Sequence, residues 1–242
     1  MRIDFVTIFP GLFTGMLDSS LIRHARDKGV LEVQVHDLRD YTQDRHRTSD
    51  DVPYGGGPGM VFKPEPIFKA VEALKAGGTK VILPTPQGKI FTQEIAETLA
   101  GLPHLIFLCG RYEGVDERIC TRLVDYELSI GDFVTMGGEL PAMIMTEAVV
   151  RFVDGVIGQR ESVVQDSFQD SLLDYPHYTR PEIFGGEKVP DVLISGNHEE
   201  IRKWRRKMAL KRTLERRPDL LEKAKLSSED QKFLEEIQKE RI

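Results

Sequence analysis

The stretch that decides the fold runs from Leu105 to Gly114 and has the sequence LIFLCGRYEG. Five apolar residues, Leu105 to Cys109, lead directly into a loop with a glycine at each end. A short continuous apolar run that stops at a glycine turn is typical of a strand buried on both faces, as in a parallel sheet. Loops at the carboxyl ends of such strands are where open α/β sheets bind ligands. We therefore expect a buried strand that leads into a binding loop.

The segments on either side alternate between short β-rich runs and amphipathic helical runs. Further strands are expected at Ile3–Ile8, Leu31–Asp37, Lys80–Leu83 and Tyr126–Ser129, and helices at Pro66–Ala76, Gln93–Ala100, Val115–Leu123 and Pro141–Val153. This alternation predicts an α/β fold in which helices cover the faces of a mainly parallel sheet.

The pattern changes after residue 157. Periodicity is lost over residues 158–173, which we interpret as an interdomain linker between a domain of residues 1–157 and a small helical domain of residues 174–242. Two helix starts are expected in the second domain. Asn197 is followed by Glu200 and Ser228 by Gln231, and both pairs have the spacing of a capping box.

Composition limits the class of protein. The 242 residues contain no apolar stretch of 18 or more, and the first strand begins without the charged and apolar regions of a signal peptide. The two cysteines, Cys109 and Cys120, are too few for a disulfide framework or a zinc cage and are expected in the core. We expect a cytoplasmic protein without a membrane span.

Basic residues are concentrated in one segment. The net charge is −6, yet residues 197–217 carry nine Lys or Arg against three Glu, so this segment is +6 and the remainder −12. Ile201, Trp204 and Met208 form an apolar stripe at helical spacing, and the arginines fall on an adjoining arc. Such an arc is either a solvated face or a track for RNA phosphates, and the small number of acids favours RNA.

Three glycine-bearing loops follow or connect the expected strands: Tyr54–Met60, Cys109–Gly114 and Ser129–Gly138. The sequence contains neither the Gly-x-Gly-x-x-Gly pattern of dinucleotide folds nor a phosphate-binding P-loop. Glycine lets backbone approach a ligand closely, and a tight turn is an alternative explanation for any single one of these glycines.

Seven motifs in order resemble one known family. They are YGGGPGM (54–60), PQG (86–88), CGRYEGVDER (109–118), GGELPA (137–142), DSF (166–168), PHYTRP (176–181) and SGNH (195–198). From Ile3 to about Leu221 the chain resembles the bacterial TrmD family of the SPOUT methyltransferases. The resemblance implies a parallel sheet with a deep trefoil knot, an arrangement rare among folds. It also implies methyl transfer from S-adenosylmethionine to N1 of guanine 37 in tRNA.

By this resemblance the methyl donor is held in three knot loops, mostly by backbone groups. The corresponding positions are Leu83, Pro84, Thr85 and Pro86 in the first loop, Gly110 and Glu113 in the second, and Ile130, Gly131, Asp132, Phe133, Val134, Thr135, Gly137 and Gly138 in the third. Many relatives have Tyr at the position of Phe133 and Leu-Ser at the positions of Thr135 and Met136, so hydroxyl contacts there are not carried over. Thr85 replaces a common serine and keeps the hydroxyl.

The resemblance also assigns catalytic roles. The general base that removes the N1 proton corresponds to Asp166, and the arginine that faces the guanine O6 corresponds to Arg151. From the sequence alone, Asp166 is equally an N-cap and Arg151 a solvated charge at a helix end. No enzyme nucleophile is needed, because the sulfonium already supplies the leaving group.

The RNA-binding residues are expected in the second domain. They are His177, Tyr178, Arg180, Arg202, Arg205, Arg206 and Arg212. Aromatic and guanidinium faces stack on the unpaired bases of an anticodon loop. His177 is equally well interpreted as a hydrogen-bonded structural histidine.

The last expectations concern a possible Mg²⁺ ion and a second subunit. Glu113 and Asp116 offer carboxylate oxygens to Mg²⁺, while an Asp116–Arg118 pair on a helix surface is an equal alternative, and no metal-ligand set is assigned. The resemblance implies a homodimer in which Asp166 reaches the knot of the other subunit. The alternative functions are another SPOUT RNA methyltransferase and a non-catalytic RNA-binding protein.

Overall fold

A computed structural model of the chain describes residues 1–158 and 166–239. The chain divides into two compact units, Met1–Gly158 and Gln159–Ile242, and each is described by itself. Of the linker expected at 158–173, residues 159–165 lie outside the described residues. Within the described ranges, no helix has both the length and the apolar content needed to cross a membrane.

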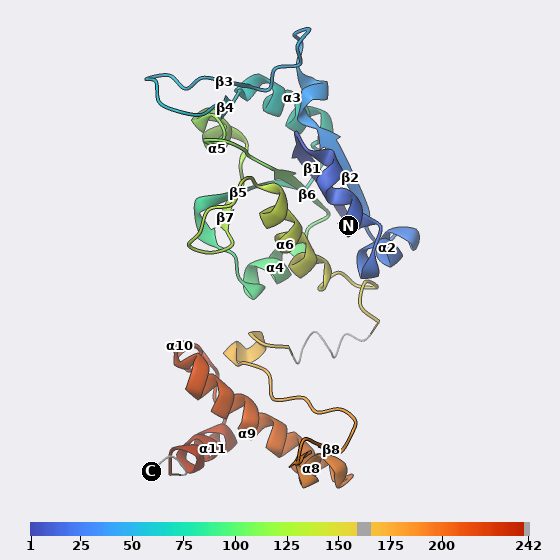
Figure 1. Cartoon of the computed structure of the whole chain (residues 1–242), viewed down its shortest axis with the longest axis vertical. Coiled ribbons are helices and arrows are strands. Elements are labelled where there is room, and N and C mark those ends of the chain that lie inside the picture. The colour runs from blue at the N-terminus through green and yellow to red at the C-terminus, as the bar shows by residue number, and fades with distance from the viewer. Residues whose placement is uncertain (159–165, 240–242) are drawn as a thin grey trace. The chain divides into compact units, whose positions relative to one another are not determined.

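The first unit is built on a five-stranded sheet with the order β2-β1-β6-β5-β7 (Figure 1). Its strands are β1 (Arg2–Thr7), β2 (Glu32–Asp37), β5 (Thr79–Ile90), β6 (His104–Leu108) and β7 (Tyr126–Ser129). Every pair of neighbouring strands is parallel, and Phe107 of β6 lies in register with Phe5 of β1 and Ile82 of β5. A small antiparallel pair, β3 (Asp50–Asp51) and β4 (Val61–Phe62), flanks the glycine-rich loop between them. The predicted α/β fold with a mainly parallel sheet is confirmed.

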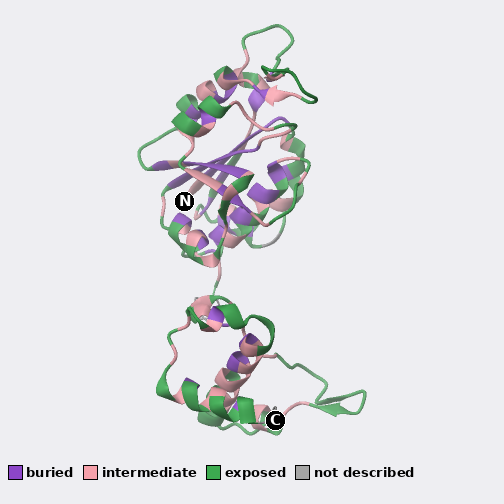
Figure 2. Ribbon diagram, turned by 90° about the vertical axis from the view of Figure 1, so that its left-hand side faces the viewer, coloured by how far each residue is buried: buried purple, intermediate pink, exposed green. Residues whose placement is uncertain are grey.

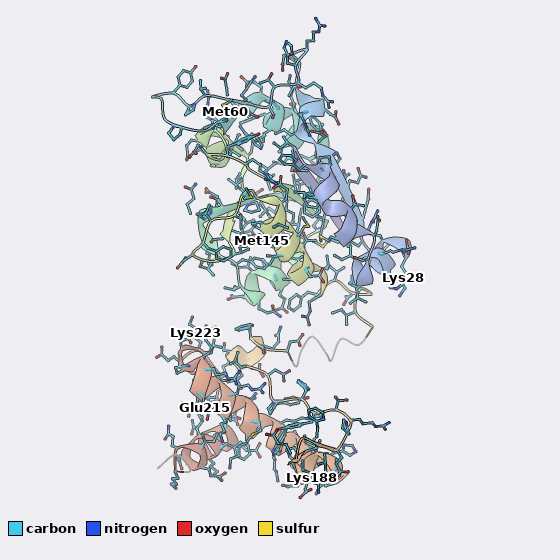
Figure 3. The ribbon with its side chains drawn as sticks, viewed as in Figure 1. Lys28, Met60, Met145, Lys188, Glu215 and Lys223 are labelled. Atoms are coloured by element: carbon cyan, nitrogen blue, oxygen red, sulfur yellow. The ribbon has the colours of Figure 1, made fainter. Side chains whose placement is uncertain are left out.

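Helices cover both faces of this sheet, and a hydrophobic core lies on each side. The helical elements are η1 (Pro10–Phe13), α1 (Thr14–Leu17), α2 (Ser20–Asp27), η2 (Leu38–Tyr41), α3 (Pro64–Leu74), α4 (Gln93–Ala100), α5 (Glu117–Leu123) and α6 (Glu139–Val150). One core joins the sheet to α2, α4 and α6, and the other joins it to α3 and α5. Figure 2 shows the strands as mostly buried ribbons between these layers. Met145 of α6, labelled in Figure 3, is fully buried in the first core.

Most expected elements form close to their expected bounds. The helix over Gln93–Ala100 and the strand over Tyr126–Ser129 are confirmed at both ends, and the remaining boundaries differ by at most three residues except at the end of β5. The helical elements between Pro10 and Asp27 were not expected from the sequence. They are only four, four and eight residues long, and a pattern that short is difficult to distinguish from a loop.

Strand β5 is the main departure from expectation. Its expected end was Leu83, but the strand continues to Ile90, with a break in its pairing to β7. Pro84 and Lys89 both lie opposite Leu128, so the residues between them form an unpaired excursion. Pro84 precedes this excursion and Pro86 lies within it, and neither can donate a ladder hydrogen bond, which explains why the strand pattern is lost there and then resumes.

The second unit is mainly helical in its described part. Its elements are η3 (Gln169–Ser171), β8 (Ile183–Phe184), β9 (Glu187–Lys188), α8 (Asp191–Ile194), α9 (His198–Arg216), α10 (Pro218–Leu221) and α11 (Ser228–Lys239). Leu172, Leu210 and Ile237 form its buried core, which joins the start of the unit to α9 and α11.

Two capping predictions for this unit have different outcomes. Asn197 caps α9, because its Oδ1 accepts a hydrogen bond from the N–H of Glu200 at 3.3 Å. The expected cap at Ser228 with Gln231 is wrong by one residue. Ser227 Oγ accepts from the N–H of Asp230 at 3.1 Å, and Asp230 Oδ2 accepts from the N–H of Ser227 at 2.9 Å. The capping box is thus formed by an aspartate, whose side chain reaches back as Glu or Gln would.

Candidate functional site

A pocket of about 250 Å³ lies beside the excursion of β5 and at the carboxyl ends of β6 and β7. Its walls come from three loops. They are lined by Pro84, Thr85, Pro86, Gly110, Arg111, Tyr112, Glu113, Gly114, Leu128, Ser129, Ile130, Gly131, Phe133, Val134, Thr135, Met136, Gly137, Gly138 and Pro141. Parallel strands place their carboxyl ends on one edge, so loops far apart in sequence converge there.

The first loop is the excursion of β5, and it passes very close to β7. A Cβ added to Gly88 would lie 2.4 Å from the backbone nitrogen of Leu128. This approach is open only to glycine, which explains the PQG motif. The loop brings Pro84, Thr85 and Pro86 to the pocket.

The second and third loops are held together by backbone bonds. The N–H of Gly138 donates to the carbonyl oxygen of Gly110 at 2.8 Å, and Arg111 forms an antiparallel bridge with Gly137. A Cβ on Gly138 would lie 3.0 Å from Cys109 Cα and from the nitrogen of Gly110. The pocket wall there is bare backbone, which fits a ligand recognised by main-chain groups.

Side chains fix the shape of the third loop. Ser129 Oγ donates to the carbonyl of Gly131 at 3.0 Å and accepts from its N–H at 3.2 Å. Thr135 Oγ1 donates to the carbonyl of Gly137 at 2.9 Å. Gly131 has a φ of +142°, and an added Cβ would meet the Phe133 ring at 2.9 Å. The loop is therefore an ordered turn that only glycine can complete at residue 131.

The expected donor-binding residues all line this pocket except Leu83 and Asp132. Leu83 lies within β5 and is buried in the core that contains α3 and α5. Asp132 is exposed and does not line the pocket. Sequence resemblance located the loops but did not separate the residues that face the pocket from those that face away.

Three polar residues around the pocket were not identified from the sequence. Glu139 is only 1% exposed; its Oε2 accepts from Arg111 Nε at 2.9 Å and its Oε1 from Thr7 Oγ1 at 2.7 Å. The Arg111 guanidinium also lies over the Phe9 ring, 4.4 Å from its centroid. The signal in the sequence was an acid at the start of the largely apolar helix α6. Such a position suggests a buried carboxylate, and a buried carboxylate requires a partner.

The second loop is also tied to the glycine-rich segment between β3 and β4. The carbonyl of Met60, a residue labelled in Figure 3, accepts from the N–H of Glu113 at 3.0 Å. A Cβ on Gly59 would lie 2.6 Å from the Glu113 side chain. The YGGGPGM segment thus ends against the pocket through glycine and backbone contacts.

Neither cysteine is suited to act as a nucleophile. Burial raises the pKa of the Cys109 thiol, and the nearby Glu139 carboxylate adds to this effect. Burial also raises the pKa of Cys120 to about 11. Both thiols are protonated at neutral pH, as the expectation of core cysteines requires.

Asp116 forms an ion pair with Arg118, which was the alternative to metal binding. Its carboxylate accepts from Arg118 Nε at 2.8 Å and Nη2 at 2.7 Å, and it caps α5 by accepting from the N–H of Arg118. The bond from Arg118 lowers the pKa of Asp116. Among the described residues, no cluster of three or more His, Cys, Asp or Glu has a metal-binding arrangement.

The two expected catalytic residues belong to different units. Arg151 is exposed and forms the C-cap of α6 in the first unit. Asp166 is half-buried and lies before η3, whose N-cap is Phe168 rather than Asp166. The backbone after Asp166 is strained, because Phe168, Asp170 and Ser171 all have positive φ. Strain of this kind, which costs about 1–3 kcal/mol per residue, persists where the surrounding structure enforces it and is frequent at functional sites.

Asp166 lines a second pocket, of about 520 Å³, within the second unit. The basic side chains Arg202, Arg205 and Arg206 of α9 line it as well. Arg205 lies over the ring of Tyr175, 4.9 Å from its centroid. This pocket combines a carboxylate, guanidinium groups and an aromatic face.

The expected RNA-binding residues differ in their surroundings. Arg206 donates to both oxygens of Asp230, at 2.7 and 2.9 Å, and these bonds lower the pKa of Asp230 to about 2. Arg202 pairs with Glu199 and Glu229, and Arg212 donates to the carbonyl of Asp174. The acids of α11 therefore offset part of the basic helix, which the charge count along α9 did not anticipate.

The remaining expected RNA contacts are exposed. Tyr178 lies near Trp204 with a centroid separation of 6.3 Å, and Arg180 is open to solvent. His177 Nε2 is 2.7 Å from Asp174 Oδ2, and its ring lies 4.5 Å from that of Tyr175. The interpretation of His177 as a hydrogen-bonded residue is thus confirmed. Its ring is nevertheless exposed to solvent.

Comparison with known proteins agrees, over nearly the whole chain, with the family resemblance of the sequence motifs. Residues 1–223 match the model of the family described as tRNA (Guanine-1)-methyltransferase TrmD. Proteins named tRNA (guanine-N(1)-)-methyltransferase from Dictyoglomus turgidum, Moorella thermoacetica and Bacillus cereus are 58%, 56% and 53% identical to it. These alignments cover 99%, 98% and 99% of this chain, and 98%, 96% and 100% of the relatives. The chain therefore belongs to the tRNA (guanine-1)-methyltransferase TrmD family.

Proposed function

We propose that this protein transfers a methyl group from S-adenosylmethionine to N1 of guanine 37, next to the anticodon of tRNA. The observation that carries the proposal is the glycine-walled pocket between the excursion of β5 and the loops after β6 and β7, in a chain of this family. The relatives named above are tRNA (guanine-N(1)-)-methyltransferases, which favours a base nitrogen over a ribose as the acceptor.

The pocket supports the choice of methyl donor. Its bare backbone at Gly110, Gly137 and Gly138 suits recognition of adenine and ribose by main-chain groups. The apolar residues Ile130, Phe133 and Val134 complete a partly enclosed site. We further propose that the chain forms the SPOUT trefoil knot through these loops. When bound, the donor supplies an activated methyl group on sulfur.

The chemistry then requires a base and a positive partner. We assign Asp166 as the base that accepts the N1 proton and Arg151 as the cation that stabilises charge on O6. The new bond joins N1 to the methyl carbon while the carbon–sulfur bond breaks, so sulfur leaves as a neutral thioether. The balance is complete with the proton on Asp166. Rate enhancement rests on alignment for in-line displacement together with this charge stabilisation.

The partners follow from charge and apolar exposure. Arg205, with Tyr175 beneath its guanidinium, and the exposed Tyr178 and Arg180 are candidate contacts for the anticodon stem-loop. The exposed apolar residues Leu140 and Ile144 of α6 support a homodimer. We propose the cytoplasm as the location, because the substrate is tRNA.

The test is transfer of labelled methyl to a tRNA transcript with G37, compared with its G37→A variant. Incorporation into the first and not the second is expected. The Asp166→Asn variant is expected to lose about 100-fold or more in transfer rate while retaining donor binding, since a general base contributes roughly 10²–10⁴-fold. Rates are measured by filter counting and donor binding by calorimetry.

The matched control is Asp170→Asn, which removes a 78% exposed carboxylate from the same loop and pocket. Its transfer rate is expected to stay within about twofold, because nothing in the proposed reaction uses it. Loss of both donor binding and transfer in Asp166→Asn would contradict the role of base. An assay arm with a chelator tests whether Mg²⁺, for which Glu113 offers an oxygen ligand, takes part in transfer.

A further inference from the structure

The basic residues of α9 lie on two adjoining faces of the helix. Each residue of an α-helix is turned by about 100° from the one before it, so residues seven and four positions apart lie nearly in line. Arg205, Arg212 and Arg216 have these spacings and form one stripe. Four further cations lie on the adjoining face: Arg202, Lys203, Arg206 and Lys207.

The adjoining face is covered by the acids of α11, which packs along α9 through the core of the second unit (Figure 1). Three ion pairs join the two helices: Arg202 Nη2 to Glu229 Oε2 at 3.2 Å, Arg206 Nε to Asp230 Oδ1 at 2.7 Å, and Lys207 Nζ to Glu236 Oε2 at 2.8 Å. Lys203 and Arg202 also pair with Glu199 or Glu200 of α9 itself. Counted over these pairs, the face has four cations and five acids, so it is net negative.

The three pairs between the helices differ in burial. The Asp230 side chain is 3% exposed, and a phosphate that took Arg206 from it would leave a buried carboxylate without its partner, which is strongly unfavourable. Glu229 and Glu236 are 41% and 54% exposed, so their pairs contribute little to stability. The buried pair therefore anchors α11 to α9, while the two exposed carboxylates present negative charge to any approaching RNA.

The stripe on the other face keeps its positive charge. Arg205 lies over the ring of Tyr175, and Arg212 donates to a backbone carbonyl, so neither guanidinium is neutralised by these contacts. Arg216 is exposed at the end of α9. The stripe extends over roughly 16 Å of helix, and Arg205 at its start lines the same pocket as Asp166. It is thus a track of positive charge that leads to the proposed base.

We propose that tRNA phosphates bind the stripe of Arg205, Arg212 and Arg216, and that Glu229 and Glu236 of α11 keep RNA off the adjoining face of α9. The inference rests on the proposed function for the identity of the RNA. Helix α11 begins after residue 223, the last residue that the family model matches. Repulsion between these acids and phosphates disfavours RNA that does not follow the stripe, so α11 acts as a determinant of specificity.

The first experiment removes the two exposed acids and keeps the buried pair. The variant is Glu229→Gln/Glu236→Gln. Its matched control is Glu222→Gln/Glu235→Gln, which changes the net charge equally but removes two exposed carboxylates that take no part in the three pairs. Fluorescence anisotropy at several salt concentrations measures how the full-length protein binds a tRNA transcript with G37 and, separately, poly(U).

Glu229→Gln/Glu236→Gln is expected to bind poly(U) about 3- to 10-fold more tightly at low salt. The slope of log K against log salt should steepen by about 1, because one or two further phosphates are contacted. Affinity for the tRNA should rise less, so the preference for tRNA over poly(U) falls. The control is expected to stay within about twofold for both RNAs. Equal affinities in the two double variants would overturn the role of α11.

The second experiment compares arginines on the two faces. Arg216→Gln is expected to weaken tRNA binding by about 3- to 10-fold and to reduce the salt slope by about 1, as loss of a phosphate contact does. Arg202→Gln should change both by less, because its charge is already paired with glutamates. An equal or larger loss in Arg202→Gln would overturn the stripe as the phosphate track.

The proposed function fails separately from this inference. If the wild type and variants bind tRNA in the expected order but the wild type transfers no methyl group to G37, the proposed reaction is refuted and the phosphate track stands. If methyl transfer to G37 occurs and the variants on the two faces bind tRNA alike, the track and the role of α11 are refuted and the proposed reaction stands.

Discussion

Gly88 illustrates, at the scale of single residues, how the pocket depends on close backbone contact. The excursion of β5 passes β7 with no room for a side chain, because Leu128 N and the carbonyl of Glu127 lie within 2.6 Å of an added Cβ. Gly138 is limited in the same way by Cys109 and Gly110. The motif glycines of these loops are thus explained by approach of backbone to backbone rather than by turn geometry alone.

We expect Gly88→Ala to lower the free energy of unfolding by about 1–3 kcal/mol, the usual cost of overpacking. Because the first loop must move to relieve the clash, donor binding should weaken as well. Urea denaturation followed by circular dichroism measures the first effect. Gly77→Ala is the control, since its added Cβ meets nothing within 4 Å. Equal stabilities of the two variants would contradict this account of the loop.

Helix starts are the features that local sequence determines best at the scale of elements, yet the start of α11 was expected one residue too late. Both Ser227 and Ser228 precede an acidic or amide residue at the right distance, so spacing alone allows either box. The choice depends on Asp230, which is buried and pairs with Arg206 of α9. Packing of α11 on α9 places Asp230 where it bonds back to Ser227, and the helix begins accordingly.

The element-scale prediction is that Ser227→Ala destabilises the second unit by about 1 kcal/mol, as loss of an N-cap does. Ser228→Ala is expected to change stability by less than about 0.5 kcal/mol, because it is not the cap. Trp204 is the single tryptophan of the chain and lies in α9, so its fluorescence follows unfolding of this unit during urea titration. A larger loss of stability in Ser228→Ala than in Ser227→Ala would show instead that Ser228 is the N-cap of α11.

The exposed face of α6 matters at the scale of the whole molecule. Leu140 is 59% and Ile144 53% exposed, and their spacing of four residues places them on one helix face. Phe9, which precedes η1, and Leu12, within η1, are also exposed, and η1 contacts α6. Exposed apolar side chains that cluster in this way mark interaction surfaces more often than isolated ones do. Our proposed homodimer would cover them.

We expect Ile144→Glu to convert the proposed dimer to a monomer, because two carboxylates would be buried at a symmetric interface. Sedimentation equilibrium measures the mass. Val52→Glu, at a 71% exposed position in the loop between β3 and β4, is the control and should leave the mass unchanged. A wild-type chain that sediments as a monomer, or an Ile144→Glu variant that remains dimeric, would exclude this interface.

Local sequence determined most of the elements and the three loops of the pocket. Gln93–Ala100 and Tyr126–Ser129 follow from periodicity and flanking turn residues, and the glycine motifs marked the loops that line the pocket. Such signals span a few residues, so they survive without knowledge of the tertiary fold. For the same reason they could not separate Leu83 and Asp132 from the residues that line the pocket.

Tertiary structure alone decided the strand order, the β5 excursion and the hydrogen bonds that join Thr7, Glu139 and Arg111. Thr7 and Glu139 are 132 residues apart in the chain and meet because β1 and α6 pack on the same core. The same holds for Arg206 and Asp230, whose pairing offsets part of a basic segment that is uncompensated in sequence. The charge and apolar character of each residue are known from the sequence, but which charged side chains form pairs is determined only when folding brings distant elements together.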